Sequence, residues 1–80
     1  MVNSTDILNA IAKIVEEVVG VDSAMVTTEK SFVDDLDVDS LAMVEMNMAI
    51  EDRFELKIPD DRVAELRTVG DMVSYIGNYR

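Results

Sequence analysis

The sequence predicts an all-α fold, a small bundle of three main helices and one short helix. Three segments repeat apolar residues at helical spacing, and no segment alternates apolar and polar residues as a half-exposed strand would. Residues that commonly start or stop helices stand at the borders of these segments. The chain has 80 residues, of which 49% are hydrophobic, so it is expected to fold as a single domain over residues 1–80.

The first helix is predicted over residues 5–19. Ser4 or Thr5 is expected to cap its start, because a short hydroxyl side chain accepts a hydrogen bond from a free backbone N–H group. Gly20 stands where a helix commonly stops in the left-handed conformation. The apolar residues recur every three or four positions, as on one face of a core helix: Ile7, Ile11, Ile14, Val15 and Val18.

Residues 20–39 show no sustained period and are predicted to form one connection, which is longer than usual for a compact domain. A short turn is expected within it at residues 31–35. Apolar residues are spread along the segment, which indicates a loop held against the core by its side chains: Val21, Met25, Val26, Phe32, Val33 and Leu36.

The second helix is predicted over residues 40–54 and carries apolar residues on two opposite faces. At about 100° per residue, the core face is expected to hold Met43, Met46, Ile50 and Phe54. The opposite face holds Leu41, Glu45, Met48 and Asp52. Apolar residues interleaved with carboxylates are typical of a docking surface for a basic partner, although isolated exposed apolar residues are also common. Asn47 falls beside the core face, in conflict with the pattern.

The C-terminal third is predicted to hold a short helix and a longer last one. Asp60, which follows Pro59, is expected to cap the short helix. Thr68 and Asp71 match a capping box, with threonine at the cap and an acid three residues later. The inward residues of the short helix are expected to be Val63 and Leu66. The apolar face of the last helix is Val69, Met72, Val73 and Ile76.

Composition excludes several classes of function. The chain has no cysteine and no histidine, so it lacks a thiol nucleophile, the commonest zinc ligand and the usual general base near neutral pH. Its net charge of −10 repels nucleic acid and anionic membranes. No apolar run approaches the roughly 18 residues of a membrane span, and the first residues do not resemble a signal peptide. A cytoplasmic location is therefore expected.

The negative charge is concentrated around the second helix. Residues 29–61 carry 11 acidic and 3 basic residues, a balance of −8 within the total of −10. Such clustering speeds association with a positively charged partner and makes binding sensitive to salt. It is also expected to destabilise the fold by self-repulsion.

Residues 37–41 place one hydroxyl, that of Ser40, among carboxylates at the start of the second helix. Catalysis by Ser40 is disfavoured because no histidine is present, Gly-x-Ser-x-Gly is absent, and surface carboxylates are feeble bases at pH 7. The chain is therefore not expected to be an enzyme.

A calcium site is the second interpretation of these residues. Asp35, Asp37 and Asp39 match the first three ligand positions of an EF-hand loop. However, Ser40 replaces the glycine that the turn requires, and Met46 replaces the bidentate glutamate. No dedicated metal site is therefore expected, while weak binding of divalent ions by the acidic cluster stays open.

A modified serine is the third interpretation. The free N–H groups and the dipole at a helix N-terminus favour a phosphate, which suits a phosphodiester on the Ser40 oxygen. The alternative is that Ser40 or Asp39 merely caps the helix. Composition alone does not decide between a cap and an attachment point.

The residues around Ser40 resemble acyl carrier proteins. Four segments are similar to that family in the same order: Ser31-Phe32-Val33-Asp34-Asp35-Leu36; Asp39-Ser40-Leu41 with Val44-Glu45; Phe54 with Lys57-Ile58-Pro59-Asp60; and Leu66-Arg67-Thr68-Val69-Gly70-Asp71. The resemblance covers nearly the whole chain. It is nearest to stand-alone carriers of dissociated (type II) fatty acid synthesis in actinobacteria, including those that elongate meromycolate chains. The chain lacks the long C-terminal extension of some meromycolate carriers, and Asn47 replaces a usually apolar residue.

The resemblance implies a four-helix carrier with 4′-phosphopantetheine attached to Ser40. A phosphopantetheinyl transferase would install the group from coenzyme A with magnesium, and growing acyl chains would be held as thioesters on its terminal thiol. The residues expected to face partner enzymes are Asp39, Leu41, Glu45, Met48 and Asp52. The expected partners beyond the transferase are ketosynthases, a malonyl transferase, reductases and a dehydratase with basic docking patches, which would bind a monomeric carrier.

The acyl chain needs cover from water, which contributes about 0.8 kcal/mol per buried CH₂ group. Unbranched methionines such as Met25, Met43 and Met46 suit a core that opens around chains of different length, although they serve equally well as gap fillers. The acyl pocket is expected at Met43, Met46, Ile50 and Phe32. A carrier for polyketide or other specialised acyl synthesis is the alternative function, and a calcium-binding or adaptor module is a more distant one.

Overall fold

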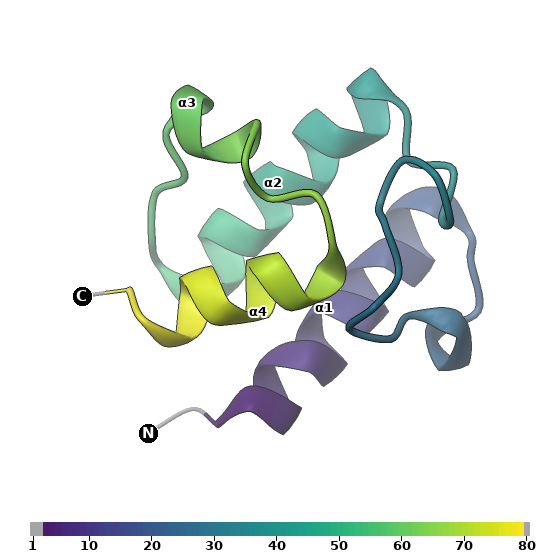
Figure 1. Cartoon of the computed structure of the whole chain (residues 1–80), viewed down its shortest axis with the longest axis horizontal. Coiled ribbons are helices and arrows are strands. Elements are labelled where there is room, and N and C mark those ends of the chain that lie inside the picture. Colours follow the sequence, from purple (N-terminus) through teal and green to yellow (C-terminus); the bar gives the residue numbers. More distant parts are fainter. Residues whose placement is uncertain (1–2, 80) are drawn as a thin grey trace.

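The computed structural model describes residues 3–79 and confirms an all-helical fold (Figure 1). Its elements are α1 (Ser4–Val19), the 3-10 turn η1 (Ser23–Met25), α2 (Ser40–Phe54), the single-turn helix α3 (Asp60–Val63) and α4 (Val69–Gly77). Within the described residues, the only strand-like pairing is an isolated antiparallel bridge between Ser31 and Thr68. No helix in residues 3–79 is both long enough and apolar enough to cross a membrane.

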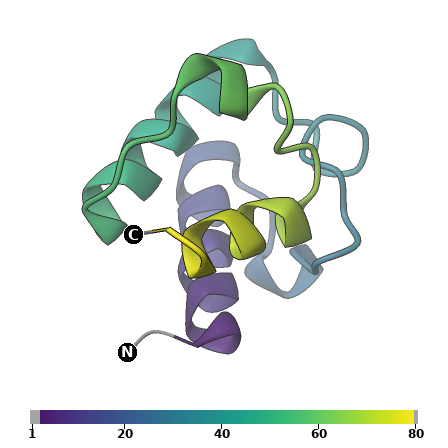
Figure 2. The same cartoon turned by 60° about the vertical axis from the view of Figure 1, so that its left-hand side comes forward.

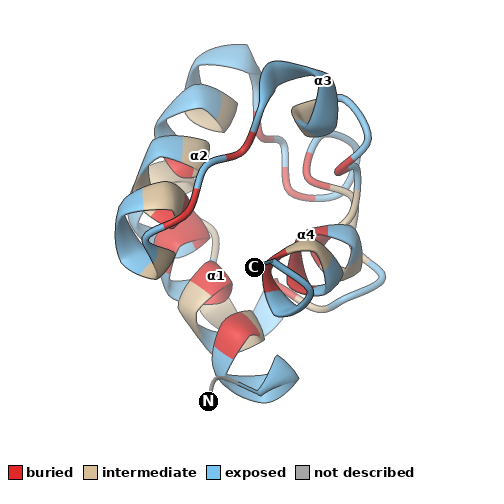
Figure 3. Ribbon diagram, turned by 90° about the vertical axis from the view of Figure 1, so that its left-hand side faces the viewer, coloured by how far each residue is buried: buried red, intermediate tan, exposed pale blue. Residues whose placement is uncertain are grey.

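Three helices enclose one core, and α1 packs against both α2 and α4. The buried residues of these helices face a common interior, as Figure 3 shows. In Figures 1 and 2, the first turn of α1 and the last turn of α4 lie at one side of the molecule, and the start of α2 lies at the opposite side. The start of α2 is therefore remote from both ends of the described chain.

The start of α1 differs from the prediction by one residue. The cap is Asn3, whose side-chain oxygen accepts a hydrogen bond from Asp6 N at 2.8 Å. Ser4 and Thr5 lie inside the first turn, so the prediction that one of them caps the helix was wrong. The predicted stop is confirmed, because Gly20 has φ of 88° and its N–H donates to the Glu16 carbonyl at 2.9 Å.

The long connection is held against the core by buried side chains, as predicted, but by a different set. Val26, Phe32 and Leu36 are buried, and so is Val38, which the sequence analysis did not single out. Met25 and Val33 are more than half exposed, so the expectation that they hold the loop was wrong. Met25 ends the single turn η1, which buries none of its residues. Val33 lies on the outer side of the predicted turn, which is closed by Asp35 N donating to Ser31 O at 3.0 Å.

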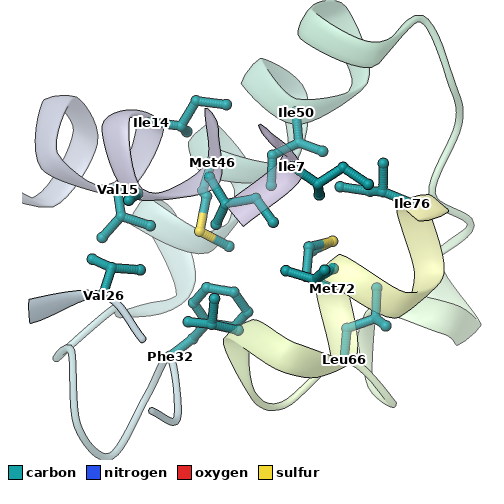
Figure 4. Packing of buried hydrophobic residues seen from close by; sticks show 14 of the residues in the cluster. Ile7, Ile14, Val15, Val26, Phe32, Met46, Ile50, Leu66, Met72 and Ile76 are labelled. Atoms are coloured by element: carbon teal, nitrogen blue, oxygen red, sulfur yellow. The ribbon is translucent and has the colours of Figure 1, made fainter. Parts of the chain in front are cut away.

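The bounds predicted for α2 are confirmed, and its core face is led by two of the four predicted residues. Met46 and Ile50 are fully buried, whereas Met43 and Phe54 are half-buried at its edge. Figure 4 shows Met46 pointing toward Phe32 in the centre of the core. The helix ends at Glu55, which takes the left-handed conformation with φ of 55° although it is not a glycine.

The short helix α3 is weakly fixed at its start. Pro59 occupies the cap position, and no side chain caps the helix. Asp60 lies inside the first turn, so its predicted capping role was wrong. The predicted capping box of α4 is confirmed: Thr68 Oγ1 accepts from Asp71 N at 3.0 Å, and Asp71 Oδ2 accepts from Thr68 N at 3.1 Å.

Candidate functional site

The segment that leads into α2 is fixed by alternating burial. Leu36 and Val38 are buried, while Asp37 and Asp39 between and after them are exposed. Val38 N donates to the Phe32 carbonyl at 2.8 Å, which joins this segment to the turn before it. Because the apolar side chains point inward, the carboxylates and the following serine are presented to solvent.

Asp39, not Ser40, caps α2. Its Oδ1 accepts a hydrogen bond from Ala42 N at 2.8 Å, and its carbonyl accepts one from Met43 N at 2.8 Å. Ser40 is the first residue of the helix and is exposed. The Ser40 hydroxyl therefore takes no part in the cap. Of the two roles that the sequence left open for Ser40, capping of α2 belongs to Asp39 instead.

Asp35, Asp37 and Asp39, which match the calcium motif, have roles in the local structure. Asp37 adopts φ of 57°, a conformation that aspartate tolerates better than most residues. Asp35 is engaged with the turn, where its Oδ2 accepts from Ser31 N at 2.7 Å. Within residues 3–79, no group of three or more acidic, histidine or cysteine side chains is arranged to hold a metal ion.

The outward face of α2 carries an apolar stripe that we define as Leu41, Val44 and Met48. Their exposed fractions are 70%, 55% and 62%. Glu45 and Asp52, which were predicted to lie on this face, are exposed as well. Val44 was not predicted to lie on this face, although its position one turn after Leu41 could have indicated it. That these residues contact partners stays a prediction.

The carboxylates near α2 are not neutralised by ion pairs within the described chain. The one ion pair in residues 3–79 joins Arg62 and Glu65 at 3.2 Å, on and just after α3. Glu51 is engaged differently, since its Oε2 accepts a hydrogen bond from Ile58 N at 2.7 Å. The acidic surface around the stripe is therefore available to a positively charged partner.

A hollow of about 400 Å³ opens between the first half of α2, the turn at residues 31–36 and α3. Its apolar lining comes from Met43, Val33, Val63, Ala64 and Leu66, and its polar lining from Ser31, Asp34 and Arg67. Of the predicted acyl pocket residues, Met43 lines this hollow.

The other three predicted pocket residues, Met46, Ile50 and Phe32, do not line the hollow. All three are fully buried in the core, where Figure 4 shows them packed with residues of α1 and α4. Val63 and Leu66 had been predicted to point inward but had not been assigned to the pocket. The inward pattern of the segment after Pro59 was the signal that could have found them.

Comparison with known protein families matches residues 9–76 to the family described as "Phosphopantetheine attachment site". The chain is 55% identical over 75 residues to the meromycolate extension acyl carrier protein of Mycobacterium tuberculosis, which covers 94% of this chain and 65% of that protein. It is 54% identical over 71 residues to the acyl carrier protein of Thermobifida fusca, covering 89% of this chain and 90% of that one. The chain thus spans slightly less than two thirds of the meromycolate relative.

The structure is also similar to a solved one. The acyl carrier protein of Enterococcus faecalis superposes with a TM-score of 0.77 at 31% sequence identity, covering 94% of this chain and 95% of that chain. The similarity therefore extends over the full helical arrangement and not only over the segment around Ser40.

Proposed function

The chain belongs to the acyl carrier proteins of the phosphopantetheine attachment family, and we propose that it carries growing acyl chains as thioesters on a 4′-phosphopantetheine arm attached to Ser40. The observation that carries this assignment is the position of Ser40, which is exposed at the first residue of α2 while Asp39 performs the capping. Its hydroxyl is thus accessible to a modifying enzyme.

The start of α2 suits a phosphodiester. The first N–H groups of a helix have no partner within the helix. Those of Ala42 and Met43 are bonded to Asp39, which leaves the N–H groups of Ser40 and Leu41 for an acceptor outside the helix. A phosphate on the Ser40 oxygen lies next to these donors and to the positive end of the helix dipole.

Attachment forms a bond between Ser40 Oγ and the phosphorus of the pantetheine phosphate, while the bond from that phosphorus to the adenosine bisphosphate part of coenzyme A breaks. The serine proton passes to the transferase. The attached arm supplies the thiol that this cysteine-free chain lacks. With neither histidine nor cysteine in its sequence, the chain acts in this proposal as a carrier and not as a catalyst.

The hollow between α2 and α3 is the proposed entrance for the acyl chain. Met43, Val63 and Leu66 offer an apolar lining, and each CH₂ group removed from water contributes about 0.8 kcal/mol. Because α3 is a single turn without a side-chain cap, it can shift at small cost when a chain enters. A longer chain would reach Met46, Ile50 and Phe32 by parting the core.

The apolar stripe and its surrounding carboxylates are the proposed docking surface. Leu41 and Met48 supply apolar contact area, and Asp39, Glu45 and Asp52 supply negative charge. The proposed partners are the transferase, ketosynthases, malonyl transferase, reductases and dehydratase, each of which would present a basic patch. We place the carrier in fatty acid synthesis, with the extension of long chains as its pathway, because relatives with more than half of their residues identical are named for meromycolate extension.

The test is mass spectrometry after incubation with coenzyme A, magnesium and a phosphopantetheinyl transferase. The native chain should gain one phosphopantetheine unit, and Ser40→Ala should gain none. Ser74→Ala is the matched control, since Ser74 is also an exposed helical serine, on α4. A folded native chain that gains no mass, or a Ser40→Ala chain that gains it, would refute the assignment.

A further inference from the structure

One polar side-chain atom of α2 lies buried without a partner. The side-chain oxygen of Asn47 is buried and has no hydrogen-bond partner within the part of the chain that the structure describes. Such an atom ordinarily costs about 1–3 kcal/mol, so native proteins keep few of them. Since an apolar residue of similar size would avoid this cost, the presence of the amide calls for an explanation.

The helix geometry places Asn47 one turn beyond Met43, which lines the hollow between α2 and α3. Asn47 follows Met43 by four residues and precedes Glu51 by four, so the three side chains share one face of α2. Met43 lines the hollow with Val63 and Leu66. Glu51 accepts a hydrogen bond from Ile58 N, in the connection that leads to α3. Asn47 does not itself line the hollow, but it lies one turn beyond Met43 on the face of α2 that Met43 and Glu51 share.

Asn47 also lies on the same side of α2 as the attachment point. Asn47 lies seven positions after Ser40, which is close to two full turns and about 10.5 Å along the helix axis. A chain that enters next to Met43 and continues along this face toward Glu51 would pass the Asn47 side chain. The unpaired oxygen would then be within reach of the cargo.

We propose that Asn47 recognises acyl chains that carry a hydroxyl group close to the thioester, the 3-hydroxyacyl class. This inference rests on the proposed function and names the cargo that the entrance prefers. A hydroxyl enclosed with an acyl chain loses its water, as the Asn47 oxygen already has, and a hydrogen bond between the two removes both penalties. The arm also carries amide N–H donors, so the form with the bare arm is the control that separates the arm from the cargo.

A hydroxyl fits this side chain better than a ketone does. The orphaned atom is an oxygen, which requires a donor, and a hydroxyl donates whereas a ketone oxygen only accepts. A hydroxyl also accepts from the amide NH₂ group, so it pairs with a carboxamide in either orientation. A saturated chain leaves the oxygen unpaired and gains nothing from Asn47.

The test compares four forms of the carrier: unmodified, with the bare arm, with an octanoyl arm and with a 3-hydroxyoctanoyl arm. Each is prepared from the matching coenzyme A derivative with the transferase, in the native chain and in Asn47→Leu, which keeps the size of the side chain and removes its polar atoms. Asn9→Leu, a change at an exposed position on α1, is the matched control. The midpoint of thermal unfolding is measured for each form.

In the native chain, the 3-hydroxyoctanoyl form should melt above the octanoyl form. Asn47→Leu should lower this difference by about 4–8 °C, the shift that one hydrogen bond of ordinary net strength makes in a domain of this size. Asn9→Leu should leave the difference unchanged. Equal midpoints for the two cargoes in the native chain, or a difference that persists in Asn47→Leu, would overturn the proposal.

The side-chain NH₂ resonances of Asn47 provide a second readout by NMR. They should move in the 3-hydroxyoctanoyl form and stay in place in the octanoyl and bare-arm forms. An equal movement with the bare arm would identify the arm as the partner and would overturn the assignment to the cargo. Neither result affects the mass gain at Ser40, so failure of this inference is distinguishable from failure of the proposed function.

Discussion

Asp39 caps α2 and Ser40 does not, so substitutions at the two positions should affect stability differently. Ser40→Ala removes an exposed hydroxyl that the cap does not use, so the free energy of unfolding should change by less than about 0.5 kcal/mol. Asp39→Ala removes the cap and should cost about 1 kcal/mol. Urea unfolding followed by circular dichroism measures both.

Asp39→Asn is the control, because asparagine keeps the capping oxygen and removes the charge. It should retain most of the stability of the native chain. A large loss of stability in Ser40→Ala would show that the serine is a structural residue and would weaken the case for attachment.

Met46 tests the core at the scale of a single side chain. It is fully buried beside Phe32, so Met46→Ala should destabilise the protein by about 2–5 kcal/mol. Leu41→Ala, on the exposed stripe, should change stability by less than about 0.5 kcal/mol. Similar effects of the two changes on the urea midpoint would contradict the assignment of the two faces of α2.

Single residues at the ends of helices were the least predictable part of the fold. Asn3 caps α1 although Ser4 and Thr5 have equally suitable side chains, since the choice depends on where the backbone first turns. Met25 and Val33 are apolar but exposed. Hydrophobicity alone does not tell which side of an irregular segment faces the core, because no period relates one residue to the next.

At the scale of the element, the end of α2 contains removable strain. Glu55 holds a left-handed conformation, which costs a residue with a Cβ atom roughly 1–2 kcal/mol and costs glycine much less. Glu55→Gly should therefore raise the stability by roughly 1 kcal/mol, measured by urea unfolding. The same change two residues earlier, Arg53→Gly, lies inside the helix and should lower it by about 1 kcal/mol. Destabilisation by both variants would contradict this account.

The outward face of α2 is tested by reversing one charge. Glu45→Lys should slow association with a basic partner enzyme about fivefold and flatten the salt dependence of the rate, since Glu45 borders the exposed stripe. Glu16→Lys makes the same change on an exposed part of α1 and is the control. Surface plasmon resonance at several salt concentrations measures both. Equal effects of the two variants would show that net charge, and not this face, governs docking.

The long helices were predictable and the irregular elements were not. The bounds of α2 and the capping box of α4 follow from local rules that tertiary contacts reinforce. The turn η1 and the burial of Val38 depend on how residues 20–39 meet the core. The lining of the hollow between α2 and α3 was predictable only in part for the same reason, since it comes from segments that are distant in sequence.

At the scale of the whole molecule, the charge distribution sets the response to salt. A net charge of −10, with no ion pairs among the described carboxylates of α2, should repel itself in the folded state. Added sodium chloride or magnesium chloride should raise the unfolding midpoint by several degrees, which corresponds to roughly 1 kcal/mol. The double variant Glu45→Lys, Asp52→Lys should respond less. A midpoint that does not move with salt would contradict self-repulsion.

The opening turn of α1 and the closing turn of α4 share one side of the molecule, and the start of α2 lies at the other (Figures 1 and 2). Ser40 is the first residue of α2. A label, a resin or a second copy that is joined near the first turn of α1 or the last turn of α4 therefore leaves Ser40 accessible. With the arm attached at Ser40 as proposed, carriers joined in tandem through these ends would present their arms on the side away from the linker.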